Sequence, residues 1–161
     1  MSIEKVRAYF RELGMEDRVR EFDVSSATVP LAAKALGCAE AHIAKSMAFA
    51  DKDGGCLMVV TAGDGKIDNR KFKDTFGMKA KMLSFEETAE KVGHAVGGVC
   101  PFAVNAGIRV FLDVSMKRFE TVYPACGSSN SAIGLSCDEL EQYSACAGWV
   151  DVCKGWQEED A

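Results

Sequence analysis

Residues 44–61 have the sequence AKSMAFADKDGGCLMVVT, in which two apolar runs flank a short polar segment. Ala44–Ala50 and Cys56–Thr61 are both of strand length and rich in apolar residues, which predicts two β-strands. The segment between them, DKDGG at residues 51–55, consists of residue types that favour turns. We therefore predict two strands joined by a tight turn, and the remaining elements are assigned outward from this pair.

Five helices are predicted from their spacing and their capping signals. Apolar residues at helical spacing run from Ile3 to Leu13, and Gly14 ends this first helix. Each of the others begins with a side chain that can cap a helix, twice with a Glu three residues later: Thr28, Asp68, Ser84 with Glu87, and Ser136 with Glu139. The predicted helices cover residues 3–13, 29–36, 69–76, 85–92 and 137–143.

Further strand-like runs lie at residues 109–114, 120–125, around 132–135, and at 149–153. Helices and strands intermix without a regular βαβ period, so the physical expectation is an α+β fold around a mixed β-sheet. The chain has 161 residues, 48% of them hydrophobic, which is enough for one sizeable core. We expect a single domain over residues 1–161, with a frayed acidic tail at Gln157–Ala161.

Charge and hydropathy restrict the classes of partner. The net charge is -5, from 19 basic and 24 acidic residues, which does not favour general attraction to DNA or to an anionic membrane. No apolar run approaches the ~18 residues of a membrane span. Charged residues interrupt Met1–Gly14, which is unlike a signal peptide. We therefore expect a cytoplasmic protein.

Seven cysteines raise the question of disulfides or a metal site. Their number is odd, and no Cys-x-x-Cys pair occurs. Structural zinc sites need closely spaced ligand pairs, which this chain lacks. We expect reduced, mostly buried thiols, and neither a bound metal nor a cofactor.

The turn Gly97-Gly98-Val99-Cys100-Pro101-Phe102 is the first candidate for a functional site. Two glycines allow another group to approach the main chain closely, and Pro101 stiffens the turn. A rigid run of exposed backbone N–H and C=O groups suits a small polar ligand or an oxyanion, although many such turns only connect elements. Cys100 with His94 also allows a cysteine-nucleophile interpretation, provided that the two side chains face one another.

Three other segments can contribute to a site. Lys45 enters a strand among apolar residues, as either an edge-strand lysine or a cation that faces a cleft. The small polar residues Gly127, Ser128, Ser129 and Asn130 suit either a ligand wall or an ordinary loop. Lys66–Lys81 carries a local charge of +4, which predicts either a solvated helix face or the place where a phosphate backbone would bind.

In their order along the chain, these motifs resemble the YbaK/EbsC and prolyl-tRNA-synthetase-associated editing domains, which are aminoacyl-tRNA deacylases. The resemblance covers nearly the whole chain, and it rests on short pieces taken together. These pieces are Thr28-Val29-Pro30, Ala44-Lys45-Ser46, Thr61-Ala62-Gly63-Asp64 with Ile67-Asp68, Gly97–Phe102, Gly127–Ile133 and Asp138-Glu139-Leu140.

The resemblance implies a curved mixed sheet flanked by helices, and a pocket for the 3′ end of a mischarged tRNA. It implies that Lys45 positions the terminal nucleotide or its phosphate. It also implies that the loop Gly97, Gly98, Val99, Cys100, Pro101 holds the aminoacyl group and orients the attacking water. The further expected substrate contacts are Thr28, Val29, Ser46, Met47, Gly127, Ser128, Ser129 and Asn130, and the expected tRNA contacts are Lys66, Arg70, Lys71 and Lys73.

The resemblance implies a free-standing enzyme that hydrolyses a mischarged small amino acid from tRNA, with tRNA(Pro) and prolyl-tRNA synthetase as the expected partners. Members of the family work mainly with a ribose hydroxyl of the substrate, so Cys100 is not needed as a nucleophile. Family members that deacylate cysteinyl-tRNA carry a serine and an aspartate where Ala125 and Ala132 align. The amino acid is therefore left open among Ala, Ser, Thr and Cys, and the alternatives are a non-catalytic binding module and a Cys100–His94 hydrolase.

Overall fold

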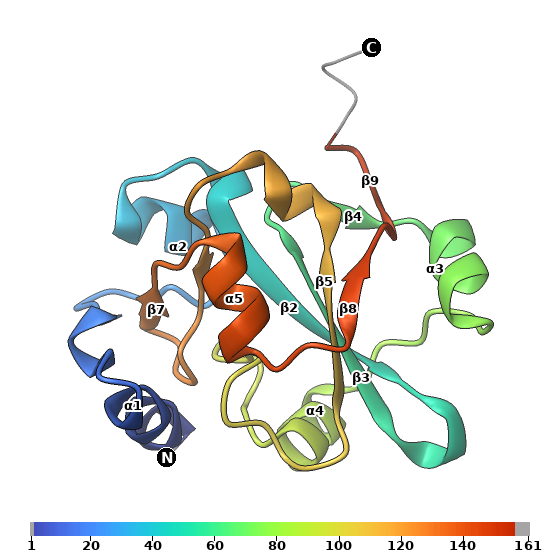
Figure 1. The fold of residues 1–161 in the computed structure, drawn as a ribbon, viewed down its shortest axis with the longest axis horizontal. Coiled ribbons are helices and arrows are strands. Elements are labelled where there is room, and N and C mark those ends of the chain that lie inside the picture. The colour runs from blue at the N-terminus through green and yellow to red at the C-terminus, as the bar shows by residue number, and fades with distance from the viewer. Residues whose placement is uncertain (1, 157–161) are drawn as a thin grey trace.

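Two antiparallel strands form the centre of a five-stranded sheet, as expected from residues 44–61. Strand β2 (Ile43–Ala50) pairs with β3 (Cys56–Ala62), with Ala44 opposite Ala62. The order of the sheet is β6-β2-β3-β5-β8, and every neighbouring pair except β2 and β3 is parallel. The other strands are β5 (Arg109–Asp113), β6 (Tyr123–Pro124) and β8 (Gly148–Val150). This computed structural model describes residues 2–156 and confirms an α+β fold with a mixed sheet flanked by helices (Figure 1).

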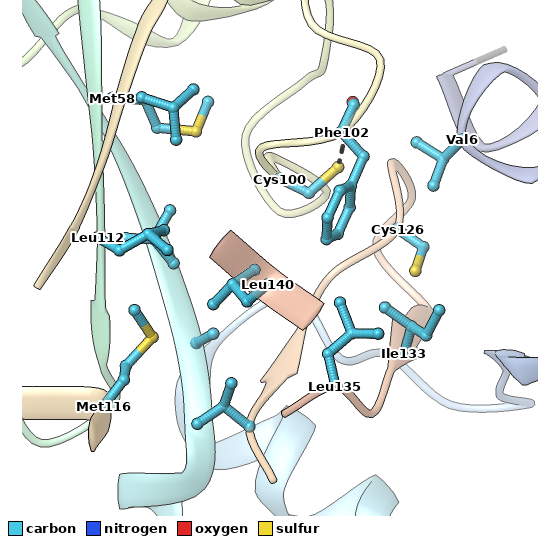
Figure 2. Packing of buried hydrophobic residues seen from close by; sticks show 14 of the residues in the cluster. Val6, Met58, Cys100, Phe102, Leu112, Met116, Cys126, Ile133, Leu135 and Leu140 are labelled. Atoms are coloured by element: carbon cyan, nitrogen blue, oxygen red, sulfur yellow. Dashed lines mark hydrogen bonds between the residues drawn. The ribbon is translucent and has the colours of Figure 1, made fainter. Parts of the chain in front are cut away.

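The central strand β3 separates two hydrophobic clusters because its side chains alternate between the faces of the sheet. Met58 and Val60 pack into the larger cluster, which also contains Phe10 of α1 and Leu140 of α5. Leu57 and Val59 face the other way, toward Phe72 of α3. Figure 1 shows α5 and α3 on opposite sides of the sheet, and Figure 2 shows the packing of the larger cluster. Both faces of β3 are therefore covered.

The five predicted helices are present, with the expected caps. Thr28 and Asp68 accept hydrogen bonds from the first turns of their helices, and Ser84 and Ser136 form complete capping boxes with a following Glu. Gly37, Gly77 and Gly93 end three of the helices in the left-handed conformation. The helices are α1 (Ser2–Glu12), α2 (Val29–Leu36), α3 (Asn69–Phe76), α4 (Phe85–Val92) and α5 (Cys137–Tyr143).

Two short antiparallel ribbons complete the described chain. Strand β1 (Val19–Glu21) pairs with β7 (Ser131–Ile133), and β4 (Lys66–Ile67) pairs with β9 (Cys153–Lys154). The sequence pattern did not indicate β1 or β4, because two- and three-residue strands carry too few side chains for a period to show. Single 3₁₀ turns lie at Glu16–Arg18, Glu40–His42, Lys52–Gly54 and Val114–Arg118.

Two predicted strands are wrong in extent. The run at 120–125 contributes β6 and a single bridge between Val122 and Leu135, and its pairing with β2 stops at Pro124, which has no N–H to donate. The run at 149–153 is divided between two sheets: β8 ends at Val150, and the buried Asp113 carboxylate accepts a hydrogen bond from Val152 N–H at 2.8 Å. The chain thus leaves the main sheet before it pairs with β4 as β9.

The predicted tail at residues 157–161 lies outside the described residues. Among the described helices, none has the length and apolarity needed to cross a membrane.

Candidate functional site

A cavity of about 370 Å³ lies beside β2 and is the candidate functional site. Segments far apart in the sequence surround it: the loop before α2, the strand β2, the segment from Met82 into α4, the turn at Gly97, and the residues around β6 and β7. Its predicted lining residues are Thr28, Val29, Lys45, Ser46, Met47, Gly97 and Val99. Its size falls in the usual range for small-ligand pockets.

The cavity lies against a part of β2 that has no strand neighbour on its outer side within the described chain. Strand β6 pairs with β2 only at Ile43 and Ala44, and Met82 forms a bridge to β2 at Phe49. Ala48 C=O and Ala50 N–H face the segment at Met82, where they bond Leu83 N–H (3.0 Å) and Lys81 C=O (2.8 Å). Because strand residues alternate, the backbone N–H and C=O of Ser46 face the same outer side. Ser46 therefore offers a backbone N–H and C=O at the cavity, whereas the backbone groups of Lys45 and Met47 face β3.

Ser46 contributes a second polar group. Its Oγ is buried and has no hydrogen-bond partner among the described residues. Buried hydroxyl groups normally have a partner, so an unpaired one in a cavity wall is available to a ligand.

Lys45 is half-buried in the wall of the cavity, and its Nζ donates a hydrogen bond to Gly65 C=O at 3.0 Å. Burial lowers the pKa of Lys45, with Lys66 acting in the same direction and the Cys153 and Asp64 side chains opposing it. Asp64 is bound by Arg118 in a two-bond ion pair, at 2.6 and 3.0 Å. Because Arg118 already neutralises this carboxylate, Lys45 is a cation without a close carboxylate partner in the described chain.

The turn at Gly97 presents backbone to the cavity. Gly97 has φ +102°, which favours glycine, and no hydrogen bond within residues 2–156 occupies the N–H of Gly97 or of Val99. Gly98 lies behind them: its C=O accepts from Gly127 N–H at 3.0 Å, and a Cβ on Gly98 would lie 2.6 Å from Ser128 N. Gly97 thus lines the cavity, whereas Gly98 permits the contact that holds the turn in place.

Cys100 and Pro101 are buried behind the turn and do not line the cavity. The Cys100 Sγ donates to Phe102 C=O at 3.7 Å and lies in the core (Figure 2). The same carbonyl lies 2.7 Å from His94 Nε2, so this nitrogen carries the proton and Nδ1 has no partner in the described chain. Burial raises the pKa of Cys100 to about 12. A thiol that is fully buried and protonated is not a nucleophile, so the geometry argues against a Cys100–His94 hydrolase.

The segment Gly127–Asn130 lies beside the cavity and not in its wall. Asn130 Nδ2 donates to Phe22 C=O at 2.9 Å, and the C=O groups of Ser129 and Asn130 accept from Ser26 and Phe22 N–H. Ser128 Oγ bonds Asn130 and Ser131. The polar groups of this segment therefore hold residues 22–26, which lead into α2. The cavity wall itself is formed by the next small residues along the chain, Ser131 and Ala132.

Of the four cations predicted to contact tRNA, three are exposed: Lys66, Arg70 and Lys73. Lys71 is half-buried and is held by Asp151 (3.1 Å) and by Cys153 C=O (2.9 Å). Lys154, which was not predicted, lies opposite Lys66 in the β4–β9 ribbon and is also exposed. This ribbon follows directly after Gly65, whose carbonyl binds Lys45, so Lys66 and Lys154 lie close to the Lys45 end of the cavity. Arg70 and Lys73 belong to α3 and do not line the cavity.

Ala125 and Ala132, which the resemblance aligns with the serine and aspartate of the cysteinyl-tRNA deacylases, line the cavity. Other lining residues were not found from the sequence. Large apolar side chains surround the entrance and are highly exposed: Met82, Phe85 and Val96. The sequence signal that could have indicated them is the apolar pair Met82-Leu83 just before the Ser84 cap. The seven cysteines are free, and the described residues contain no group of three His, Cys, Asp or Glu side chains placed to hold a metal ion.

Comparison with known proteins agrees with the resemblance given by the motifs. Residues 24–143 match the model of the aminoacyl-tRNA editing domain. YwhH of Bacillus subtilis (strain 168), an uncharacterized protein, is 50% identical over 157 residues, which are 98% of this chain and all of that protein.

Two solved structures share the fold. One is described as "a putative trans-editing enzyme for prolyl tRNA synthetase" and is 25% identical, with a TM-score of 0.85 over 96% of this chain and 98% of its own. The other, hypothetical protein APE2540, is 28% identical, with a TM-score of 0.83 over 93% of this chain and 99% of its own. The family model covers about three-quarters of the sequence, including every segment that lines the cavity. The protein therefore belongs to the aminoacyl-tRNA editing domain family.

Proposed function

We propose that this protein is a free-standing deacylase that hydrolyses the ester bond of a mischarged small amino acid on tRNA. One observation carries the proposal. In this member of the editing-domain family, a single small cavity is lined by the half-buried Lys45 and by Gly97 and Val99, whose backbone N–H groups have no hydrogen-bond partner among the described residues. An ester of this kind needs orientation and stabilisation of a developing oxyanion, which such groups supply.

We assign each lining residue a role from the chemistry of the groups that it offers to the substrate. Lys45 carries a positive charge with no close carboxylate partner, so it binds the phosphate or ribose at the 3′ end of the tRNA. The N–H groups of Gly97 and Val99 face the aminoacyl group and stabilise charge on its carbonyl oxygen. Water is the nucleophile, and the family resemblance assigns its activation to a ribose hydroxyl of the substrate. Cys100 takes no chemical part.

The size of the cavity favours a small amino acid. Val29, Met47, Ala125 and Ala132 give the aminoacyl pocket apolar walls, and Ser46 Oγ offers it one polar contact. Alanine, serine, threonine and cysteine all fit this description, because one methylene changes binding in such a pocket by only about 1–3 kcal/mol. The preferred tRNA is tRNA(Pro), on the strength of the similarity to the solved structure described above.

Binding of the tRNA itself is expected to be weak and salt-dependent. The chain carries a net charge of -5, and only a few exposed cations are proposed to contact the tRNA: Lys66 and Lys154 in the ribbon that follows Gly65, and Arg70 and Lys73 on α3. A few phosphate contacts give a shallow dependence on salt and a modest affinity. Recruitment by prolyl-tRNA synthetase would compensate for this weakness.

The test is a panel of tRNA(Pro) molecules charged with alanine, serine, threonine, cysteine or proline. We expect the wild-type protein to release at least one of the small non-cognate amino acids and to spare prolyl-tRNA. Lys45→Ala is expected to lower kcat/KM by about 10- to 150-fold, which corresponds to the about 1.5–3 kcal/mol of a hydrogen bond to a charged group. Lys52→Ala is the matched control, since Lys52 is an exposed lysine in the turn at the far end of β2.

Each outcome of this panel bears on the proposal. Release of no amino acid above the spontaneous rate would refute the deacylase activity, and retained binding of the charged tRNA would then identify a non-catalytic module. Equal rates of deacylation in Lys45→Ala and Lys52→Ala would show that Lys45 does not contribute to the reaction, while the deacylase activity itself would still stand.

A further inference from the structure

The entrance of the cavity carries large apolar side chains that the fold does not use. Phe85 is 75% exposed, Met82 60% and Val96 45%. All three line the cavity, and we refer to them as the apolar mouth. They come from three places in the chain: the segment before α4, the first residue of α4, and the turn before Gly97.

The exposure of Phe85 contradicts the pattern of its own helix. Residues 85, 88 and 92 share one helix face, and two of them, Thr88 and Val92, are buried (4% and 0% exposed). Helical periodicity therefore predicts that Phe85 is buried as well. Its ring contacts no other aromatic ring in the described chain, although eight such pairs occur elsewhere. A local rule broken beside a binding site is a sign that the position serves a ligand.

The backbone beneath Phe85 is held firmly. Ser84 Oγ accepts from Glu87 N–H, and the Glu87 carboxylate accepts from Ser84 N–H, both at 3.1 Å. Just upstream, the main chain on both sides of Met82 is bonded to β2 through Lys81 C=O and Leu83 N–H. The backbone that carries the ring is therefore fixed before a ligand binds, so the ligand need not order this segment.

A nucleobase is the ligand that fits such a mouth. This step rests on the proposed function, in which the substrate ends in an unpaired nucleoside whose ester lies deeper, near Lys45. An exposed aromatic ring binds an unpaired base by stacking, whatever the identity of the base. A protein partner needs far more surface, about 800 Å² on each side, than three side chains around an entrance offer. We infer that Phe85 stacks on the terminal base of the tRNA, with Met82 and Val96 against its edges.

The test compares substitutions at Phe85 in deacylation and in nucleotide binding. We expect both Phe85→Ala and Phe85→Leu to lower kcat/KM for the charged tRNA by about 5- to 150-fold, the range for loss of one stacked base. Phe85→Trp should keep the wild-type rate, and its fluorescence should fall when adenosine 5′-monophosphate binds. Leu13→Ala is the matched control, because Leu13 is also exposed (42%) and does not line the cavity.

A second measurement separates this inference from the proposed function. Binding of adenosine 5′-monophosphate to the wild-type protein, measured directly by equilibrium dialysis, should weaken in Phe85→Ala and Phe85→Leu to the same degree as deacylation. It needs no ester hydrolysis, so it tests the base site even if the wild-type protein proves inactive on every charged tRNA.

Three results would overturn the inference. The first is an unchanged rate of deacylation in Phe85→Ala and Phe85→Leu when the wild-type protein is active. This result would support the deacylase activity and show that Phe85 does not contact the base. The second is no binding of the nucleotide by the wild-type protein at millimolar concentration. The third is loss of self-association in Phe85→Ala with unchanged nucleotide binding, which would make the mouth a contact between protein chains.

Discussion

The turn at Gly97 and the apolar mouth line the same cavity, but they are held by the fold in different ways. Behind Gly97, the chain is packed backbone to backbone, with Gly98 against Gly127 and Ser128. At the mouth, Phe85 and Met82 are more than half exposed to solvent, and Val96 is nearly half exposed. The first region has no space for one additional methyl group, and the second leaves three large side chains uncovered.

This difference agrees with the roles that we propose for the two regions. Close packing fixes the position of unoccupied backbone N–H groups to within a narrow range, which is what stabilisation of a developing charge requires. Exposed apolar side chains contribute little to the core, and a group of them at a cavity entrance is typical of a ligand-binding surface. Substitutions in the turn should therefore act through stability, and substitutions at the mouth should act through substrate binding.

The largest effect on stability is expected for Gly98→Ala. The new Cβ would lie 2.6–2.8 Å from the backbone of Gly127 and Ser128, and backbone cannot move aside as a flexible side chain can. We expect the free energy of unfolding to fall by about 3 kcal/mol, the upper range for overpacking. Denaturation by urea measures it, together with the loss of activity that displacement of the turn would cause.

Gly55→Ala is the control for this substitution. Gly55 has φ -81°, and its Cβ would find its nearest neighbour at 3.4 Å, so the change should be close to neutral. Equal stability of the two variants would mean that the contact between Gly98 and Gly127 is looser than the geometry indicates.

A pH-dependent effect is expected from His94, which closes the same turn. Its Nε2–H donates to Phe102 C=O, and the turn Gly97–Pro101 lies between the two residues. Burial lowers the pKa of His94 below 6.5; the hydrogen bond to Phe102 C=O partly opposes this, and the nearby Lys5 adds to it. The neutral form is therefore favoured in the folded protein. Stability is complete above pH 6.5 and declines as the pH falls from 6.5 toward the lowered pKa, because the unfolded chain binds the proton first.

His94→Gln tests this assignment because an amide can donate to the same carbonyl and does not titrate. Urea denaturation between pH 7.5 and 5 should give a sloping stability for the wild-type protein and a flatter one for the variant. Glu139, whose pKa the Arg18 guanidinium lowers to about 2, does not interfere in this window, because its effect on stability begins only below pH 4.5. If the free energy of unfolding depended on pH in the same way in both proteins, the group responsible would not be His94.

The main elements were predictable because their signals are local. Capping boxes and glycine stops fixed the helices to within two residues of their bounds, and the two apolar runs at 44–61 identified the central strands. The short ribbons were not predictable, since Lys66 and Lys154 pair across 88 positions of sequence. The site was predicted in part: Lys45 and Gly97 line the cavity, but nothing local shows that Cys100 is turned into the core. Phe85 was missed because helical spacing gives it the pattern of a buried residue.

The smallest effect on stability is expected from substitutions in the two capping boxes. One box lies beside the apolar mouth and the other begins a helix away from the cavity, so the pair allows a comparison of the two places. Ser84→Ala and Ser136→Ala should each lower the free energy of unfolding by about 1 kcal/mol, because each removes the same capping hydrogen bond, which measures 3.1 Å in both helices. The helix that Ser136 caps, α5, packs Leu140 into the core, and none of its residues lines the cavity. The two variants are therefore matched in stability and differ in their distance from the substrate.

Only Ser84→Ala should impair deacylation. Phe85 follows directly after the cap, so loss of the cap loosens the first turn of α4 and the position of the ring. We expect kcat/KM to fall by a few-fold in Ser84→Ala, through a higher KM, and to stay at the wild-type value in Ser136→Ala. Steady-state rates well below the melting temperature of both variants measure this. Equal losses in both would mean that activity follows global stability, and that the mouth needs no fixed backbone to bind its ligand.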